Sequence, residues 1–250
     1  MTTDFAIKTA TVNCHSGATT IPAYLAHPVE AQGLPTIVVL QEVFGVNAHI
    51  REVTERLAQE GYIAIAPHLY HRQAPGFEVG YGPDDLAAGR TYKDGTKADE
   101  LLQDIQGAIA YVQNQFQAVP PQAGCIGFCF GGHVAYLAAT LPTVRATATF
   151  YGAGLNRFTP GGGPPTISRT PAIQGTIYGF FGLQDPLIPP SEVNEIEEML
   201  KDCAIDHRIY RYADAGHGFF CDRRDSYNTT AADDAWQHVK ALFQKALKPS

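Results

Sequence analysis

Short apolar runs alternate with segments of helical periodicity along most of this chain, and this alternation limits the folds that it can adopt. Residues 35–40 and 63–67 are almost continuously apolar, as expected of strands buried on both faces. Between them, residues 47–60 carry apolar side chains at spacings of three and four, and Gly61 follows where a helix would end. Strands that alternate with helices predict right-handed crossovers and a mostly parallel central sheet flanked by helices.

The other segments continue this pattern. Residues 5–14 and 21–27 alternate in hydropathy and predict an antiparallel pair at one edge of the sheet. Further strands are expected at 125–128, 146–151, 175–181 and 207–212, and further helices at 97–117, 133–140, 190–202 and 229–246. Two stretches have no clear period: 68–96 predicts a loop with short helical pieces, and 153–171 predicts a long loop rich in proline and glycine.

The composition is that of an ordinary globular protein. The 250 residues are 45% hydrophobic and 17% charged, and a chain of this length can form one domain over 1–250 with a large core. The net charge of −7 argues against nucleic-acid binding and against an anionic membrane surface. With nucleic acid and membranes excluded, we expect the binding partner to be a small molecule. We also expect the protein to be a monomer.

The first residues and the cysteines suggest where the protein acts. Residues 1–5 show neither a basic nor an apolar leader, and no apolar run approaches the roughly 20 residues of a membrane-spanning helix. The five cysteines form no CxxC pair, which argues against a disulfide framework and against structural zinc. We therefore expect free thiols in a cytoplasmic protein.

The strongest chemical signal is the segment Gly-Phe-Cys-Phe-Gly-Gly at residues 127–132. It follows a short apolar strand and precedes a helix, which is the pattern of a nucleophile elbow with cysteine in place of serine. The glycines permit a tight turn that exposes Cys129, and the start of the helix favours negative charge on its sulfur. The backbone N–H of Phe130 is directed at the same place. The alternative is a buried structural cysteine in a glycine-rich turn.

An elbow of this kind predicts an acid and then a histidine, in that order along the chain. Asp185 follows the strand expected at 175–181, and His217, flanked by glycines, follows the last expected strand. Alone, either would be an ordinary loop residue. Because all three come after strand ends in the required order, we expect Asp185 to orient His217, His217 to transfer the proton, and Cys129 to attack a carbonyl carbon.

The sequence resembles the dienelactone hydrolase (carboxymethylenebutenolidase) family over nearly its whole length. The segments that carry the resemblance are 41–47 (QEVFGVN), 69–76 (LYHRQAPG), 127–132 (GFCFGG), 182–185 (GLQD) and 216–219 (GHGF). The resemblance implies a single-domain α/β-hydrolase fold. In this fold the loop after the strand at 35–40 supplies a second oxyanion donor, for which the N–H of Val43 is expected beside that of Phe130.

The resemblance also implies roles for charged residues. Glu42 matches a glutamate that lies against the nucleophile and takes the thiol proton when substrate arrives; a plain loop glutamate is the alternative. Arg72 matches an arginine that binds the substrate carboxylate, unless it is a surface residue. The family has a second arginine four residues after the catalytic histidine, where this chain has Cys221. Arg223, or its neighbour Arg224, is expected to replace it.

Two further features were considered for binding. Phe150 and Tyr151 follow a strand and are expected in the pocket wall, with core packing as the alternative. The glycine triplet at 161–163 lacks the residues of a phosphate loop, and the histidines at 68, 71 and 133 lack ligand spacing. We therefore expect neither a metal nor another cofactor.

A cysteine nucleophile restricts the substrate. The tetrahedral intermediate expels either the thiolate or the leaving group of the substrate, and a thiol with a pKa of about 8.5 leaves before a simple alkoxide. Forward reaction needs a stabilised leaving group, so we expect hydrolysis of an activated, anionic enol lactone such as dienelactone to a diacid. The alternatives are a broad carboxylesterase or thioesterase of the same fold, favoured by Cys221, and a ligand-binding hydrolase-fold protein without catalysis.

Overall fold

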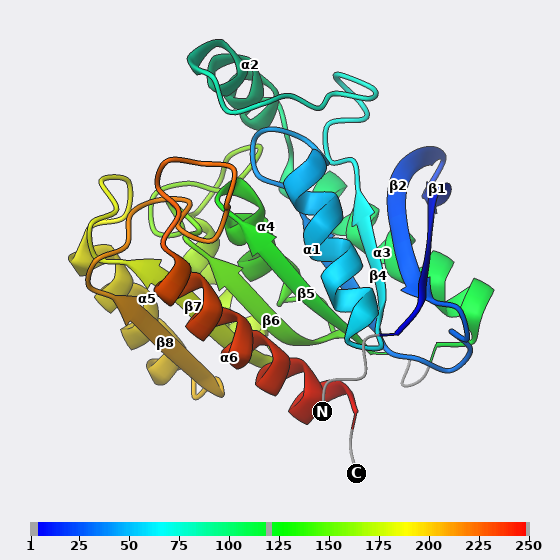
Figure 1. Ribbon diagram of the computed structural model, residues 1–250. Helices are drawn as coiled ribbons and strands as arrows, with labels where there is room; N and C mark the ends of the chain where they lie inside the picture. Colours follow the sequence, from blue (N-terminus) through cyan, green and yellow to red (C-terminus); the bar gives the residue numbers. More distant parts are fainter. Residues whose placement is uncertain (1–4, 119–121, 249–250) are drawn as a thin grey trace.

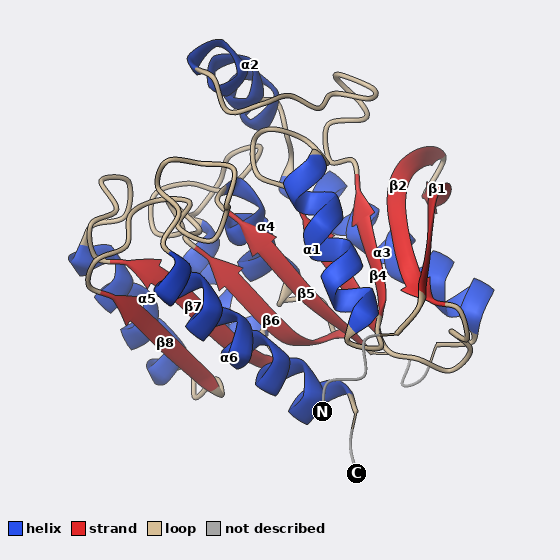
Figure 2. Ribbon diagram, in the orientation of Figure 1, coloured by secondary structure: helices blue, strands red, loops and turns tan. Residues whose placement is uncertain are grey.

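Eight strands form one twisted sheet at the centre of the molecule (Figures 1 and 2). The computed structural model describes residues 5–118 and 122–248. Across the sheet the strand order is β1-β2-β4-β3-β5-β6-β7-β8. The strands are β1 (Ile7–Ser16), β2 (Thr19–Pro28), β3 (Thr36–Leu40), β4 (Ile63–Pro67), β5 (Ala123–Phe128), β6 (Val144–Phe150), β7 (Thr176–Gly182) and β8 (His207–Tyr212).

Helices cover both faces of this sheet. On one face lie α1 (Ala48–Gln59) and α6 (Thr229–Leu247), and on the other lie α3 (Ala98–Phe116), α4 (Phe130–Ala138) and α5 (Pro190–Asp202) (Figure 1). The helix α2 (Pro83–Asp94) stands apart from both layers, at the top of Figure 1. Within residues 5–118 and 122–248, no helix has an apolar stretch that could cross a bilayer.

The directions of the strands bring their carboxyl ends to one edge of the sheet. β1 pairs with β2, and β2 with β4, in antiparallel register, whereas the strands from β4 across to β8 are parallel to one another. Leu40 pairs with Gly127, so β3 and β5 end at about the same level. The predicted antiparallel edge pair and the mostly parallel sheet are therefore confirmed, and side chains that follow β3, β5, β7 and β8 can meet at one place.

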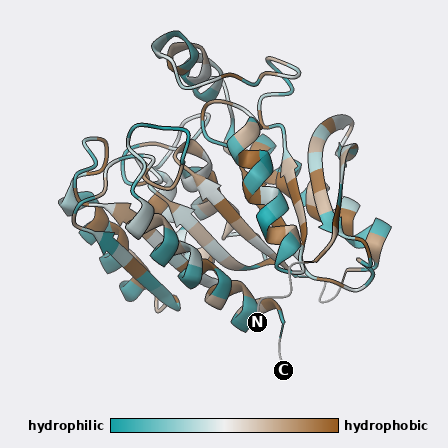
Figure 3. Ribbon diagram, in the orientation of Figure 1, coloured by the Kyte–Doolittle hydropathy of each residue, from teal (hydrophilic) through white to brown (hydrophobic). Residues whose placement is uncertain are grey.

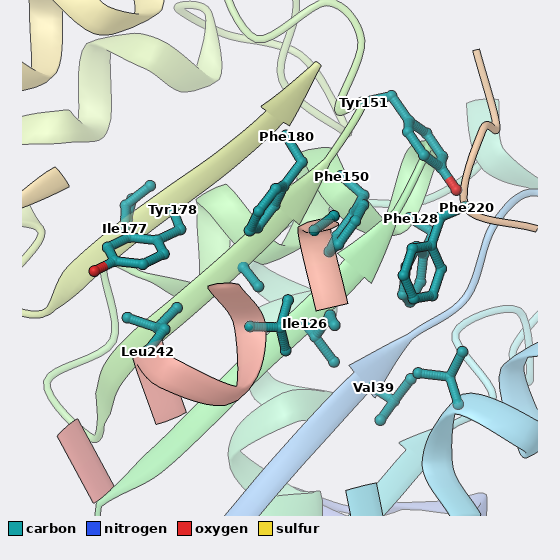
Figure 4. Packing of buried hydrophobic residues seen from close by; sticks show 14 of the residues in the cluster. Val39, Ile126, Phe128, Phe150, Tyr151, Ile177, Tyr178, Phe180, Phe220 and Leu242 are labelled. Carbon is teal, nitrogen blue, oxygen red and sulfur yellow. The ribbon is translucent and has the colours of Figure 1, made fainter. Parts of the chain in front are cut away.

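Aromatic side chains fill the core beneath that edge. Phe128, Phe150 and Phe180 come from three neighbouring strands and are fully buried (Figure 4). The ring centroid of Phe150 lies 4.9 Å from that of Phe128 and 4.4 Å from that of Phe180. Burial of each such ring contributes about 1.5–3 kcal/mol. Apolar residues concentrate on the strands and on the inward faces of the helices (Figure 3), which makes the edge of the sheet a rigid base.

The segment 68–96 differs from the loop with short helical pieces that its sequence predicts, because it contains the 12-residue helix α2. Only Gly89 of this helix is buried, so no apolar stripe marks it in the sequence. A Cβ at position 89 would lie 2.2 Å from the carbonyl oxygen of Val43. Close backbone contact at Gly89 brings α2 against the loop after β3, and the partly buried side chains of Leu86 and Tyr92 add apolar packing.

The segment 153–171 is a loop up to Pro165, as predicted, and then forms the 3₁₀ helix η1 (Thr166–Ala172). His133 of α4 holds this loop in place. Its Nε2 lies 2.7 Å from the hydroxyl of Thr166 and its Nδ1 lies 2.9 Å from the carbonyl oxygen of Ala153. Burial lowers the pKa of His133 to about 4, so the ring is neutral and acts here as a structural anchor.

Candidate active site

Cys129 lies at the turn between β5 and α4 in a conformation that few residues adopt. Its φ and ψ are 54° and −116°, and its N–H donates to the carbonyl oxygen of Phe150 at 3.0 Å. Such a backbone costs about 1–3 kcal/mol and persists only where the surroundings impose it. The thiol is partly exposed. The turn therefore presents one strained, accessible sulfur at the edge of the sheet, as the elbow pattern predicts.

Close backbone contacts explain the glycines around this turn. A Cβ at Gly127 would lie 1.9 Å from the carbonyl oxygen of Gly131, and one at Gly131 would lie 2.2 Å from that of Leu40. A Cβ at Gly132 would lie 2.3 Å from the carbonyl oxygen of Phe150. Because each obstacle is backbone, a methyl group cannot be accommodated by a change of rotamer. The glycines thus allow α4 to start directly against β3 and β6.

Asp185 and His217 form a hydrogen-bonded pair at the same edge. Nδ1 of His217 donates to Oδ2 of Asp185 at 2.7 Å, and the other carboxylate oxygen accepts from the N–H of Leu187 at 2.8 Å. The side chain of Asp185 is only 1% exposed. Both carboxylate oxygens are therefore occupied, which fixes the orientation of the imidazole ring.

His217 and Cys129 line the same cavity. Burial by itself disfavours the imidazolium, but the interactions with Cys129 and Asp185 outweigh it and raise the pKa of His217 to about 10. Nε2 is buried and has no hydrogen-bond partner in the described part of the chain. The sulfur of Cys129 is nevertheless near enough to favour the protonated ring, both through its charge and through a hydrogen-bonding interaction. A protonated ring beside the sulfur is the arrangement that supports a thiolate.

Two backbone N–H groups belong to residues of the same cavity. Phe130 begins α4 and Val43 lies in the loop after β3, and both line the cavity together with Cys129. Neither N–H donates to another described residue. The orientation of the Phe130 N–H follows from its place in the first turn of a helix, where N–H groups lack intrahelical partners. The two groups are the candidate donors to a negatively charged oxygen.

Glu42 is completely buried and forms an ion pair with Arg224, which lines the cavity. Its Oε1 accepts from Nη1 of Arg224 at 2.9 Å, and its Oε2 has no partner among the described residues. Arg224 reaches this position across Gly218, where a Cβ would lie 2.4 Å from the guanidinium. Glu42 is therefore a buried carboxylate with one oxygen still available, and it is joined to the cavity wall through Arg224.

The cavity itself has a volume of about 240 Å³. Its wall combines apolar side chains with four cationic ones, and no carboxylate of a described residue lines it. The cationic residues are Arg90, Lys93, Arg157 and Arg224. Arg90 forms no ion pair with a described residue, whereas Arg157 pairs with the buried carboxylate of Glu192. The wall thus favours a small ligand that carries a negative charge.

Arg72 does not lie at this cavity, contrary to the sequence expectation. Its guanidinium forms two hydrogen bonds with the buried carboxylate of Asp104, at 2.5 and 2.7 Å. Burial alone would raise the pKa of Asp104, but hydrogen bonds from His71, Arg72 and Ser16 outweigh it and lower that pKa. Arg72 therefore neutralises a buried charge between α3 and the loop after β4, and this pairing occupies the face that a substrate carboxylate would need.

Three other expectations also change. Arg223 turns outward and pairs with Glu52 at the surface, so Arg224 is the arginine that reaches the cavity. Phe150 is a core residue, which was the alternative interpretation. Tyr151 is fully buried and does not line the cavity. Its ring packs edge-on to that of His217, with centroids 5.1 Å apart. On its other contacts it lies beside Phe128 and Phe150 in the core (Figure 4).

The sequence did not indicate three of the four cationic residues. Arg90 and Lys93 come from α2, which was expected to be a loop, and Arg157 comes from the loop after β6. The spacing of Leu86 and Arg90 by four residues is consistent with one helix face, but it is too weak a signal in a polar segment. Outside the cavity wall, the described residues include one group with metal-ligand chemistry: His49, Cys221 and Asp222.

Comparisons with known proteins identify the family of the chain. The sequence model described as "Dienelactone hydrolase family" matches residues 21–247. A protein of Synechocystis sp. named "Putative carboxymethylenebutenolidase" is 53% identical over 248 residues, covering 99% of this chain and 100% of the relative.

Solved structures extend the comparison. The crystal structure titled "Putative Dienelactone Hydrolase" from Klebsiella pneumoniae superposes with a TM-score of 0.85 at 31% identity, covering 96% of this chain and 99% of the other. The acylaminoacyl peptidase of Pyrococcus horikoshii has a TM-score of 0.74 at 15% identity, over 98% of this chain and 42% of the peptidase. The second likeness concerns the fold alone, which is that of the α/β-hydrolases.

Proposed function

The chain belongs to the dienelactone hydrolase family, and from that premise we propose that it hydrolyses an activated, anionic enol lactone through a cysteine acyl-enzyme. The observation that carries the proposal is the meeting of Cys129, His217 and Asp185 at a small cavity lined by cationic side chains. Each of the three follows the end of a parallel strand, which is where enzymes of open α/β sheets bind their substrates.

In the first half of the proposed cycle, the sulfur of Cys129 forms a bond to the lactone carbonyl carbon, and the thiol proton passes to Glu42 or His217. The carbonyl oxygen becomes an oxyanion, which the N–H groups of Phe130 and Val43 stabilise. The intermediate then collapses: the ring C–O bond breaks, the enolate oxygen takes up the proton, and the acyl group stays on the sulfur as a thioester.

In the second half, His217 accepts a proton from a water molecule that attacks the thioester carbon. Collapse of the second tetrahedral intermediate breaks the C–S bond, regenerates the sulfur nucleophile and releases the product as a diacid. Asp185 stabilises the imidazolium at both stages because its carboxylate stays hydrogen-bonded to Nδ1. An enolate suits the first collapse because, unlike an alkoxide, it leaves about as readily as a thiolate.

The cationic wall supports a carboxylate on the substrate. Arg90 has no anionic partner among the described residues, and it lies on the solvent side of the cavity. A ligand carboxylate that approaches Arg90 and Lys93 gains charge-assisted hydrogen bonds. Arg90 has no ion pair with a described residue that would first have to break. We therefore assign to Arg90 and Lys93 the docking role that the sequence suggested for Arg72.

Arg224 gives Glu42 a role that depends on the substrate. With no anion in the cavity, the guanidinium neutralises Glu42. A substrate carboxylate near Arg224 competes for the same guanidinium, and Glu42 is then free to accept the thiol proton of Cys129. Activation of the nucleophile would thereby be coupled to binding of an anionic ligand.

A broad carboxylesterase or thioesterase of the same fold is the second candidate. It is favoured by Cys221, a neutral residue where the family has an arginine, and by the apolar part of the cavity wall, which includes Leu86, Phe158 and Leu187. A ligand-binding protein without catalysis is a minor third possibility, since binding does not require a strained cysteine next to a histidine–aspartate pair.

The test is a comparison of kcat/KM for dienelactone, a neutral aryl ester and an acyl thioester with the purified wild-type protein and the Cys129→Ala variant. We expect the highest value for dienelactone and loss of turnover of all three substrates in the variant. A higher value for the thioester or the aryl ester would favour the second candidate. Normal turnover by Cys129→Ala would refute the cysteine mechanism altogether.

A further inference from the structure

A second cluster of reactive side chains lies beside the active-site cavity. His49 comes from the first turn of α1, and Cys221 and Asp222 come from the loop between β8 and α6, which is orange in Figure 1. One potential ligand atom from each residue lies within 4.8 Å of those of the other two. None of these residues has a role in the proposed hydrolysis, so the cluster needs an explanation of its own.

His49 carries the strongest sign that a ligand is expected there. Its side chain is buried, with 4% of the residue exposed, and its Nε2 has no hydrogen-bond partner among the described residues. An unpaired buried ring nitrogen is costly and calls for a partner. An imidazole nitrogen is among the commonest metal ligands in proteins. Ring contacts with Phe128 and Phe220 hold it in place.

Cys221 supplies a buried sulfur that is already hydrogen-bonded. Its thiol donates to the hydroxyl of Tyr81 at 3.2 Å, and the side-chain amide of Asn47 donates to that same hydroxyl at 3.2 Å. Burial raises the pKa of Cys221 to about 11, but a coordinated metal ion deprotonates a thiol outright. The hydroxyl of Tyr81 can then donate to the thiolate, which is the supporting contact that metal ligands commonly have.

Charged residues of both signs surround the cluster. Glu42, Asp222 and Glu52 act electrostatically on His49, against the guanidinium of Arg56. Glu42 is paired with Arg224 and Glu52 with Arg223, so Asp222 is the carboxylate among these three that has no ion pair with a described residue. That guanidinium lies over the rings of Phe220 and Trp236. A small cavity of about 80 Å³ borders the cluster and is lined by His49 and Asp222 among others, which gives an ion a path from solvent and room for a water ligand.

We propose that His49, Cys221 and Asp222 bind a divalent ion of the zinc type, with one coordination position open toward the small cavity. A nitrogen, a sulfur and a carboxylate oxygen are the ligands that zinc prefers. Tetrahedral bonds of about 2.0–2.3 Å separate ligand atoms by roughly 3.3–3.8 Å. The exposed Asp222 can move to close the remaining distance. Such an ion would fasten the loop that also carries His217 to the start of α1.

The first experiment titrates purified Cys129→Ala with ZnCl₂ in competition with a chromophoric chelator, because that background removes the thiol of the active site. We expect one equivalent to bind. Asp222→Asn should weaken binding at least about tenfold. Asp225→Asn is the matched control, since it removes the same charge from an exposed position three residues further on, and it should bind as tightly as the parent. Equal weakening in both would mean diffuse attraction only and would overturn the proposal.

The second experiment identifies the ligands with Co²⁺. The Cys129→Ala protein loaded with Co²⁺ should show a sulfur-to-cobalt charge-transfer band, and Cys129→Ala/Cys221→Ser should lack it. A band that persists in the double variant, or the absence of stoichiometric binding by Cys129→Ala, would contradict the assignment. Circular dichroism establishes that each variant is folded, and Asp222→Asn provides a test on an exposed side chain if the buried substitution disrupts the fold.

Discussion

Arg224→Met should destabilise the protein strongly because it leaves the completely buried carboxylate of Glu42 without its ion-pair partner. Removing one member of a buried pair costs about 3–5 kcal/mol. The side chain of Arg224 is 21% exposed, so water can reach the pair, and we expect the lower end, about 3 kcal/mol. At about 2–4 °C per kcal/mol for a chain of this size, the melting temperature should fall by roughly 6–12 °C.

The chain offers a control at the neighbouring position. Arg223 also pairs with a glutamate, Glu52, but both side chains are largely exposed, so Arg223→Met should leave the unfolding free energy almost unchanged. Urea unfolding at pH 7 measures both variants. The double variant Glu42→Gln/Arg224→Met removes the orphaned charge and should recover most of the loss. Equal effects of the two arginine substitutions, or no recovery in the double variant, would refute the buried ion pair as the cause.

Three further outcomes follow from the same geometry. Arg90→Met should raise KM for substrates with a carboxylate but not for a neutral aryl ester; equal increases would mean that Arg90 only supports the fold. The pKa of His217 is raised from about 6.5 in the unfolded chain to about 10 in the folded protein, so protonation of this ring stabilises the fold fully below pH 6.5. This contribution is lost as the pH rises through about 10. The free energy of unfolding of the wild type should therefore decline over that interval more than that of His217→Gln. Iodoacetamide, followed by mass spectrometry, should label Cys129 before Cys125, whose burial raises its pKa; the reverse order would contradict the exposed elbow.

Much of the candidate site could be predicted because its signals are local. The glycines at 127, 131 and 132 fall within one short segment of the sequence, and at each of them a Cβ would meet backbone, either of the turn itself or of the neighbouring strands β3 and β6. The positions of Asp185 and His217 follow from strand ends, which hydrophobic runs of a parallel sheet mark clearly. The meeting of these residues then follows from the directions of the strands.

The charged residues around the cavity could not be assigned in this way. The sequence predicts substrate binding by Arg72 and Arg223, but each has an acidic partner away from the cavity that neutralises it. The helix α2 carries Arg90 without a buried apolar stripe, because a glycine contact with Val43 and the partly buried Leu86 and Tyr92 suffice to hold it in place. Long-range charge pairing leaves no periodic trace in a sequence.

The sequence by itself determined the sheet, the elbow at Cys129 and the order of the acid and the histidine, because buried strands and tight turns restrict residue type position by position. Only the tertiary structure decided which arginine reaches the cavity and which faces solvent. It also brought His49 next to Cys221 and Asp222, from segments far apart in the chain. The physical reason is that the strength of an ion pair or of a metal–ligand contact depends on the distance between the side chains, and that distance is set only when the chain folds.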